Sequence, residues 1–385
     1  MNGFLLIIRY LFYVVWIPAW WLQIFIPRKK NIWVFGSWHG KEYSDNSKLL
    51  YEHIVNNYPQ INAIWLTRSK EVEQFVKGSY LICSIKGIIL SLRAGVVVFS
   101  SGNTDVNRFF INGAKIIQTW HGAPMKKIGA DDLYHYKPLK NSILKFFFPF
   151  VYKYNQHAVI STAKVFNEKL STAFKTNNIW LTGYPRNDTL FSKIKSPSIE
   201  RINGSYDNPR KIMYLPTFRD HNKNFQPFEK YNFDEIKWTN YLEETNSVII
   251  TKIHFAMQKS FKGSKSNRII HLNKIMGDDL NLILKDIDIL ITDYSGVFFD
   301  FLILNKPIVL ACFDLDEYQK KSRDLYFDYE NEIIGTKCNN WEEVLLALDQ
   351  KNFIKYNKQY IKRFNNYTDN KSCERLTNKI IELTQ

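Results

Sequence analysis

In this chain of 385 residues, a histidine in a glycine-containing turn is the residue best suited to catalysis. His121 follows the apolar run 114–117, and Gly122 and Pro124 come directly after it. Open α/β sheets bind ligands where their strands end. An imidazole there can act as a general base near neutral pH. The pattern predicts chemistry on an anionic substrate, and a turn histidine bonded to backbone is the alternative.

A second group of polar and basic residues lies at strand ends in the C-terminal half. The candidates for phosphate binding are Thr217, Arg219, Lys252, His254, Ser295, Gly296 and Arg323. Because side chains alternate along a strand, Lys252 and His254 face the same side and can meet one anion. Ser295 and Gly296 precede a helix whose first N–H groups are unpaired and carry positive dipole character. This convergence suits a nucleotide diphosphate.

Some of these assignments have plain alternatives. Asp300, about one turn into that helix, can accept from a ribose hydroxyl, or it is a surface or capping carboxylate. Arg323 is a phosphate contact or a surface charge. Lys126 and Lys127 contact substrate phosphate or lipid headgroups, or they are solvated surface charge.

A glycine-bearing loop after the first strand is the candidate acceptor site. Gly40 permits a tight strand-to-helix loop, and Asp45 or Asn46 suits the cap of the next helix. Such a loop can receive an anion or a hydroxylated acceptor, whereas a capped structural turn is the alternative. Residues 183–188 are interpreted as an architectural turn from which Arg186 can reach the cleft.

Composition favours an anionic partner. The formal net charge is +15 and 16% of the residues are aromatic, which fits a phosphate-rich substrate, an anionic bilayer or nucleic acid. No nucleic-acid motif is present. The four cysteines are far apart, so we expect no disulfides, with Cys83 and Cys312 buried. No acidic metal cage is visible, and we expect no tightly bound metal.

The first 30 residues predict a membrane-associating segment. Residues 4–26 are apolar, but Arg9, Pro18 and three tryptophans favour a helix lying in the interface over a span or a buried helix. The basic run 28–30 favours the cytoplasmic face for the rest of the chain. The basic-aromatic stretch 137–153 touches lipid or forms a buried helix.

Short apolar strands then alternate with amphipathic helices, which is the rhythm of parallel α/β sheets. The predicted strands are 32–35, 63–66, 80–83, 96–100, 115–120, 158–161, 179–182, 211–215, 247–253, 268–271, 287–292 and 307–312. The polar stretch 192–210 is interpreted as a linker, and 341–349 and 356–383 as closing helices. We therefore expect two Rossmann-like lobes, 31–195 and 205–385, with a cleft between them.

Five motifs together resemble the CDP-glycerol glycerophosphotransferase family, the teichoic-acid primases and polymerases of the Gram-positive envelope. They are residues 118–129, 183–188, 216–219, 252–254 and 292–296 with Asp300. Residues 43–46 and 323–329 also look familial. The resemblance runs from about residue 31 to about 350, with the motifs in family order.

The resemblance implies a GT-B fold, with CDP-glycerol bound by the C-terminal lobe and no tightly bound cofactor. It implies that His121 and His254 are the essential histidines of two motifs, and that Gly40, Asp45, Asn46 and Gly122 lie on the acceptor side. It further implies peripheral attachment to the cytoplasmic face of the membrane. There, glycerol phosphate would pass to an undecaprenyl-diphosphate-linked glycan in teichoic-acid or capsule synthesis, and CMP would be released.

Two positions depart from the family pattern, and several functions stay open. Ala123 stands where the family usually has Thr, and Gly296 where it has a second Ser, so each removes a hydroxyl. The chain lacks the long extra N-terminal domain of many polymerases, which favours a primase-like single addition. The alternatives are a glycerol- or ribitol-phosphate polymerase, a GT-B glycosyltransferase that uses a nucleotide sugar, and a non-catalytic polyanion binder.

Overall fold

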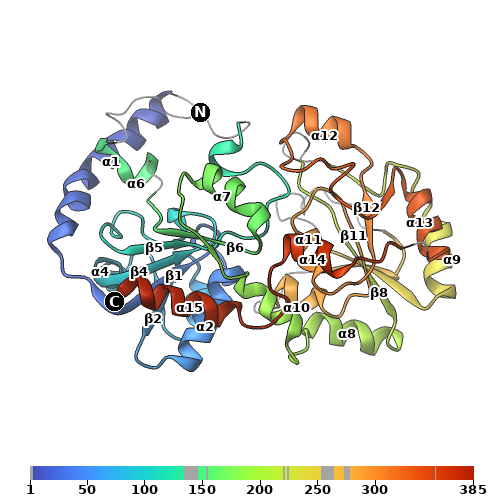
Figure 1. The fold of residues 1–385 in the computed structure, drawn as a ribbon, viewed down its shortest axis with the longest axis horizontal. Helices are drawn as coiled ribbons and strands as arrows, with labels where there is room; N and C mark the ends of the chain where they lie inside the picture. The colour runs from blue at the N-terminus through green and yellow to red at the C-terminus, as the bar shows by residue number, and fades with distance from the viewer. Residues whose placement is uncertain are drawn as a thin grey trace.

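Two parallel sheets, each surrounded by helices, form two lobes that lie side by side (Figure 1). The computed structural model describes residues 3–133, 146–152, 155–219, 222, 225–252, 264–272, 278–351 and 353–385. The α/β class with two Rossmann-like lobes, predicted from the alternation of strands and helices, is confirmed.

The N-terminal sheet has seven parallel strands in the order β3-β2-β1-β4-β5-β6-β7. Their bounds are β1 Lys29–Gly36, β2 Asn62–Thr67, β3 Ser79–Leu81, β4 Ala94–Phe99, β5 Lys115–Gln118, β6 Ala158–Ser161 and β7 Ile179–Leu181. Their apolar runs are continuous because helices cover both faces of a parallel sheet. The strand order reverses between β1 and β4, so the carboxyl ends of these strands border a crevice.

The C-terminal sheet has six parallel strands in the order β10-β9-β8-β11-β12-β13. Their bounds are β8 Arg210–Leu215, β9 Ser247–Thr251, β10 Ile269–His271, β11 Ile289–Thr292, β12 Ile308–Ala311 and β13 Thr336–Cys338. The order reverses between β8 and β11. Twelve of these thirteen strands coincide with predicted strands, whereas the short β13 was not predicted.

Helices connect the strands in both lobes. The N-terminal lobe contains α2 Asp45–Asn57, α3 Lys70–Phe75, α4 Ile85–Arg93, α6 Pro149–Tyr152 and α7 Asn167–Phe174. The second half of the chain contains α8 Pro197–Tyr206, α9 Glu235–Glu244, α10 Leu280–Leu284, α11 Val297–Leu302, α12 Leu315–Lys321, α13 Trp341–Asp349, α14 Lys358–Phe364 and α15 Ser372–Thr384. Cys312 is buried as expected, but Cys83 is exposed because it follows the edge strand β3.

The segment predicted as a linker is partly helical. Helix α8 occupies its centre: the Ser196 hydroxyl accepts from the Ile199 N–H at 3.3 Å, and Pro197 takes the first helical position. Proline is favoured there because that N–H has no helical partner. The chain returns at its end, since α15 lies against α2 of the N-terminal lobe (Figure 1). Asp188 caps α15 by accepting from the Ser372 and Cys373 N–H groups, both at 2.9 Å.

Helix α1, Gly3–Leu22, lies along the outer side of the N-terminal lobe (Figure 1). Tyr13 and Trp20 are buried in a cluster with Phe148 and Phe150, whereas Leu22 on α1 and Phe25 just beyond it are exposed. No helix within the described ranges has the length and apolar character that crossing a bilayer requires.

The basic flank after α1 is partly tied to the N-terminal lobe. Arg28, the first residue of the basic run, donates to the carbonyls of Ser91 and Asn112. Burial lowers the pKa of its guanidinium to about 10. Arg28 therefore anchors the end of α1 to the lobe and is not a freely solvated charge.

Candidate active site

The loops after β1 and β5 place three residues with strained backbone at the carboxyl edge of the N-terminal sheet. Trp38, His39 and Trp120 all have left-handed backbone angles, with φ of 45°, 58° and 53°. Each such residue costs on the order of 1–3 kcal/mol and persists only where its surroundings enforce it. Strain of this kind gathers at functional sites, and here it surrounds His121.

His121 is held between two indole rings. Its ring centroid lies 3.9 Å from that of Trp120 and 4.9 Å from that of Trp38. Nδ1 has no hydrogen-bond partner among the described residues. Burial lowers the pKa of His121 to about 4, although Asp45 and the Ser100 backbone favour the charged form. The imidazole is therefore neutral at pH 7 and able to accept a proton.

Arg186 joins the histidine loop to both lobes. Its Nη1 donates to the His121 carbonyl at 2.6 Å and pairs with Asp45 at 3.2 Å. Its Nη2 donates to Asp300 on α11 of the other lobe. The two carboxylates raise the pKa of Arg186, so the guanidinium stays charged. One planar fork thus fixes the histidine backbone, the start of α2 and the start of α11.

Asn46 and Gly122 complete this junction on the N-terminal side. Asn46 donates to the Trp120 carbonyl at 2.9 Å and accepts from the Arg186 N–H at 3.1 Å. Gly122 has a φ of 147°, and a Cβ added there would lie 2.8 Å from Nη2 of Arg186. The predicted acceptor-side residues Asp45, Asn46 and Gly122 are therefore brought together around His121 by Arg186.

Gly40 lies further from this junction. It is buried, with a φ of +74°, and a Cβ added there would lie 2.6 Å from the Ile82 side chain. Its carbonyl accepts from the Thr67 hydroxyl at 3.0 Å. The tight turn after β1 therefore requires a glycine at this position. This agrees with the alternative interpretation of the loop as a structural turn.

Arg219 does not face the cleft, contrary to its predicted role in phosphate binding. Its side chain is 2% exposed and pairs with Asp293 at 2.8 Å and, through two nitrogens, with Asp314 at 2.8 Å. The rings of Tyr294 and Tyr318 flank the guanidinium. The two carboxylates raise its pKa. These contacts lie within the C-terminal lobe, where Arg219 holds the loops after β8, β11 and β12.

Asp300 is likewise not open to a ribose hydroxyl. The residue is 1% exposed and pairs with Arg186. Its second oxygen, Oδ1, has no hydrogen-bond partner within the described chain. Burial raises the pKa of Asp300 and the nearby guanidinium opposes that shift. The carboxylate is a lobe-to-lobe contact.

The remaining donor-side candidates border the junction to different degrees. The Thr217 N–H donates to Asp293 at 2.8 Å, while its buried hydroxyl has no partner among the described residues. Ser295 is half-buried, and its hydroxyl accepts from the Val297 N–H at 3.4 Å. A Cβ added at Gly296 would lie 2.4 Å from the Ala123 carbonyl. The two positions that depart from the family pattern therefore touch each other across the lobes.

Lys252 is half-buried directly after β9, and His254 lies outside the described residues. The predicted pairing of these two side chains on one anion stays a prediction.

A short strap crosses between the lobes beside the histidine loop. The Tyr326 N–H donates to the Met125 carbonyl at 2.9 Å, and the Lys127 N–H donates to the Asp324 carbonyl at 2.8 Å. The Lys127 ammonium also pairs with Asp324, and Arg323 pairs with Asp132 at 3.4 Å. Lys127 is thus a lobe-to-lobe contact, and Arg323 contacts an acid of the N-terminal lobe.

The sequence predicts that Arg186 reaches the cleft but assigns no binding or catalytic role to it. The signal was present: an arginine that follows Gly-Tyr-Pro has a rigid approach to its partners. Those partners could not be identified, because Asp45 and Asp300 lie 141 and 114 positions away along the chain.

Comparison with known proteins agrees with this architecture. Residues 19–382 match the family model described as CDP-Glycerol:Poly(glycerophosphate) glycerophosphotransferase. The chain is 30% identical to the teichoic acid glycerol-phosphate primase of Bacillus subtilis over 89% of its own length and 86% of the primase. It is 29% identical to the teichoic acid poly(glycerol phosphate) polymerase of the same organism, over 84% of its own length, and spans 44% of that protein.

The fold has a solved counterpart. The structure of the wall teichoic acid polymerase TagF superposes with a TM-score of 0.70 at 24% identity, covering 93% of this chain and 90% of the other. This likeness supports the GT-B type of fold. The family match supports the predicted enzyme class, a CDP-glycerol glycerophosphotransferase, and confirms the resemblance carried by the five motifs. The chain belongs to the CDP-glycerol:poly(glycerophosphate) glycerophosphotransferase family.

Proposed function

We propose that the chain transfers glycerol phosphate from CDP-glycerol to a hydroxyl of a lipid-linked glycan, with His121 as the general base. The acceptor oxygen attacks the phosphorus that bears glycerol, the bond from that phosphorus to the CMP oxygen breaks, and CMP leaves. His121 takes the proton of the attacking hydroxyl. The observation that carries this proposal is a neutral imidazole at a strand end, fixed by Arg186 to both lobes.

The N-terminal lobe supplies orientation for the base. Phosphoryl transfer relies on positioning and electrostatics more than on covalent chemistry by the protein. The two indoles restrict the His121 ring, and the bond from Arg186 restricts its backbone. A base held in this way is ready to meet an acceptor hydroxyl without further reorganisation.

The donor is assigned to the carboxyl edge of the C-terminal sheet, where Thr217, Lys252 and Ser295 lie at three strand ends. The Thr217 hydroxyl and the half-buried Ser295 are polar groups that remain for a diphosphate once Arg219 is committed to its two carboxylates. His254, which belongs to the motif at residues 252–254, is proposed to act at the same strand end as Lys252. Donor specificity then depends on the contact between Gly296 and the Ala123 carbonyl, which sets how closely the lobes approach.

The acceptor is assigned to the membrane surface. Exposed apolar side chains on and just after α1 form one face of the N-terminal lobe, and Phe146 lies 5.3 Å from Trp21 between ring centroids. The members of this lipid-facing patch are Val14, Val15, Trp21, Leu22, Ile24, Phe25, Phe146 and Phe147. A patch of this kind marks an interaction site. It suits peripheral attachment at the cytoplasmic face, where an undecaprenyl-diphosphate-linked glycan is within reach.

The test is an assay of CMP release and product mass with a synthetic lipid-linked acceptor. CDP-glycerol, CDP-ribitol and a UDP-sugar are supplied in turn. We expect CMP and a product heavier by glycerol phosphate only with CDP-glycerol, and the mass also counts the units added. Release of UDP from the UDP-sugar, with a product heavier by one sugar, would instead identify a glycosyltransferase.

A histidine control separates catalysis from folding. His121→Asn should lower turnover by about 10²–10⁴-fold, the usual worth of a general base. His157→Asn should leave turnover nearly intact, since His157 lies before β6 and its Nδ1 accepts from the Ile116 N–H at 3.0 Å. Full activity of a folded His121→Asn protein would remove His121 from the mechanism.

A further inference from the structure

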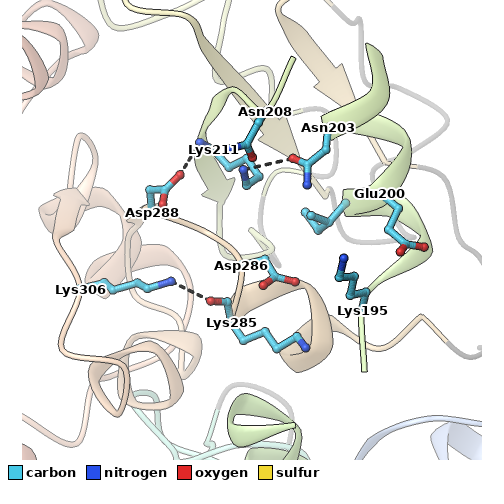
Figure 2. Close-up of a pocket in the computed structure, with 10 residues that line it drawn as sticks. Lys195, Glu200, Asn203, Asn208, Lys211, Lys285, Asp286, Asp288 and Lys306 are labelled. Carbon is cyan, nitrogen blue, oxygen red and sulfur yellow. Dashed lines mark hydrogen bonds between the residues drawn. The ribbon is translucent and has the colours of Figure 1, made fainter. Parts of the chain in front are cut away.

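A cavity of about 540 Å³ lies at the opposite edge of the C-terminal sheet from the candidate active site. Its lining comes from the segments before β8, β11 and β12, from α8 and from the connection between the lobes (Figure 2). The lining residues are Lys195, Ile199, Glu200, Asn203, Asn208, Lys211, Lys285, Asp286, Asp288 and Lys306. Because β8 has six residues, the sheet alone separates this cavity from the carboxyl edge by roughly 20 Å. We call it the amino-edge pocket.

Two of its lysines are held by neutral oxygens of the pocket lining and of residues beside it. Lys211, which is 7% exposed, donates to Asn203 Oδ1 at 3.2 Å and to the Pro209 carbonyl at 2.8 Å. Lys306 donates to the carbonyls of Lys285 and Ile287, both at 2.7 Å. Figure 2 shows these two side chains reaching in from different parts of the lobe.

Lys285 follows the same pattern, since its ammonium donates to the carbonyls of Ser192 and Ile194. An ammonium has three hydrogens, so Lys211, Lys285 and Lys306 each keep one that no described group accepts. Within the described parts of the chain, none of the four lysines has a carboxylate oxygen within 4.0 Å of its nitrogen. Asp288 and Asp286 act on Lys306 from beyond that distance, so the lysine ammonium groups still have hydrogens for an anionic ligand, which their positive charge favours.

The carboxylates that line the pocket favour a ligand that also carries hydrogen-bond donors. Asp288 accepts from the Lys211 backbone N–H at 2.7 Å, whereas Glu200 and Asp286 face the same space as the lysines (Figure 2). Four lysines and three carboxylates leave one positive charge in excess. Carboxylates and amides accept from or donate to hydroxyl groups, and the volume lies in the range of about 300–1,000 Å³ of small-molecule sites.

We propose that the amino-edge pocket binds a small phosphate ester that also carries hydroxyl groups, such as a polyol phosphate. The phosphate meets the lysines, and the hydroxyls meet Asp286, Glu200 and the two asparagines. The pocket adjoins the connection between the lobes, because Lys285 holds the Ser192 and Ile194 carbonyls of that segment. This site is independent of whether the cleft transfers glycerol phosphate.

The test is calorimetric titration of the full chain in the absence of CDP-glycerol. The probes are glycerol 3-phosphate, the diester glycerophosphoglycerol, inorganic phosphate and glycerol. We expect saturable millimolar or tighter binding of glycerol 3-phosphate, weaker binding of inorganic phosphate and none of glycerol. Binding of the monoester alone identifies a free metabolite as the source, and equal binding of the diester identifies a polymer unit. No saturable binding of either ester overturns the proposal.

Charge variants locate the binding. Lys195→Glu should weaken the binding of glycerol 3-phosphate about tenfold, because a charge near the bound phosphate is reversed. Lys193→Glu is the matched control: it lies in the same segment but does not line the pocket, and should change the affinity less than about twofold. Glu200→Gln should strengthen binding. Equal losses in both lysine variants would show general charge attraction and refute the site.

A cleft variant separates the two proposed sites. His121→Asn should leave the titration unchanged, so binding that disappears in this variant would place the ligand in the cleft and overturn the assignment to the amino-edge pocket.

Discussion

The neutral state of His121 makes a prediction about pH. Its neutral form is the base, and burial between two indoles lowers its pKa to about 4. Protonation, and with it loss of the base, should therefore begin well below the usual histidine range. We expect the acidic limb of kcat/KM to be centred near pH 4, measured by CMP release with circular dichroism at each pH to exclude unfolding. A limb centred near 6.5, the ordinary histidine value, would contradict the burial of the imidazole.

Arg186 makes a prediction about stability. Arg186→Leu leaves Asp300 buried and unpaired, which typically costs about 3–5 kcal/mol. Arg186→Leu combined with Asp300→Asn should recover part of that loss, since Asp45 is then the one carboxylate of this network left without its arginine partner. Calorimetric unfolding of the single and double variants gives the coupling between the two side chains.

A surface pair is the control for this cycle. Arg363 pairs with Glu332, and their side chains are 38% and 34% exposed. Arg363→Leu should therefore change the unfolding free energy by less than about 1 kcal/mol. If the two arginine variants lost similar stability, the Arg186 network would be no more than a surface contact.

Residue types at strand ends could be predicted from the sequence, but their partners could not. Both Arg186 and Arg219 follow an apolar strand and a proline; Arg219 was predicted to bind phosphate, and Arg186 to reach the cleft from an architectural turn. The structure commits Arg219 to Asp314, 95 positions further along the chain, and Arg186 to Asp300. An arginine fork matches a carboxylate as well as a phosphate, so the sequence alone cannot decide between them.

Elements were predicted better than side-chain partners, for a physical reason. A parallel strand is buried on both faces and therefore appears as an apolar run, as in the wholly buried β4. Strand β13 has three residues, Thr336–Cys338, and two of them are polar, so it gave no such run. Helix α8 was hidden in a polar stretch, although its Ser-Pro start is a helix signal.

The start of α11 makes a prediction at the scale of elements. Gly296→Ala places a Cβ 2.4 Å from the Ala123 carbonyl, so α11 and the histidine loop must move apart. Overpacking of this kind costs typically about 1–3 kcal/mol, and turnover should fall because the lobes no longer approach closely. Unfolding calorimetry and the CMP-release assay measure both effects.

Helix α8 supplies the control for that substitution. A Cβ added at Gly204 meets nothing within 4 Å, and alanine is favoured over glycine in a helix by roughly 0.5–1 kcal/mol. Gly204→Ala should therefore stabilise the protein and leave turnover unchanged. A Gly296→Ala protein that behaved like Gly204→Ala would show that the lobes do not meet at this point.

For the molecule as a whole, the orientation of α1 decides how the proposed membrane attachment should be tested. Deleting residues 1–30 removes the exposed face, but it also removes Tyr13 and Trp20 from the core of the N-terminal lobe, together with the first residues of β1. If the truncated protein no longer bound liposomes, the result could not distinguish unfolding of the lobe from loss of the membrane contact. Substitutions confined to the exposed face avoid this ambiguity.

Leu22→Glu combined with Phe25→Glu should release the protein from anionic liposomes, because the two side chains are 62% and 81% exposed and a carboxylate is repelled by the surface. Ile236→Glu is the control: Ile236 is 75% exposed on α9, which lies at the far end of the other lobe (Figure 1). Co-sedimentation should fall for the first variant and not for the second. Equal retention of both proteins on liposomes would move membrane attachment away from α1. Equal release would mean that net charge, and not the lipid-facing patch, holds the chain at the bilayer.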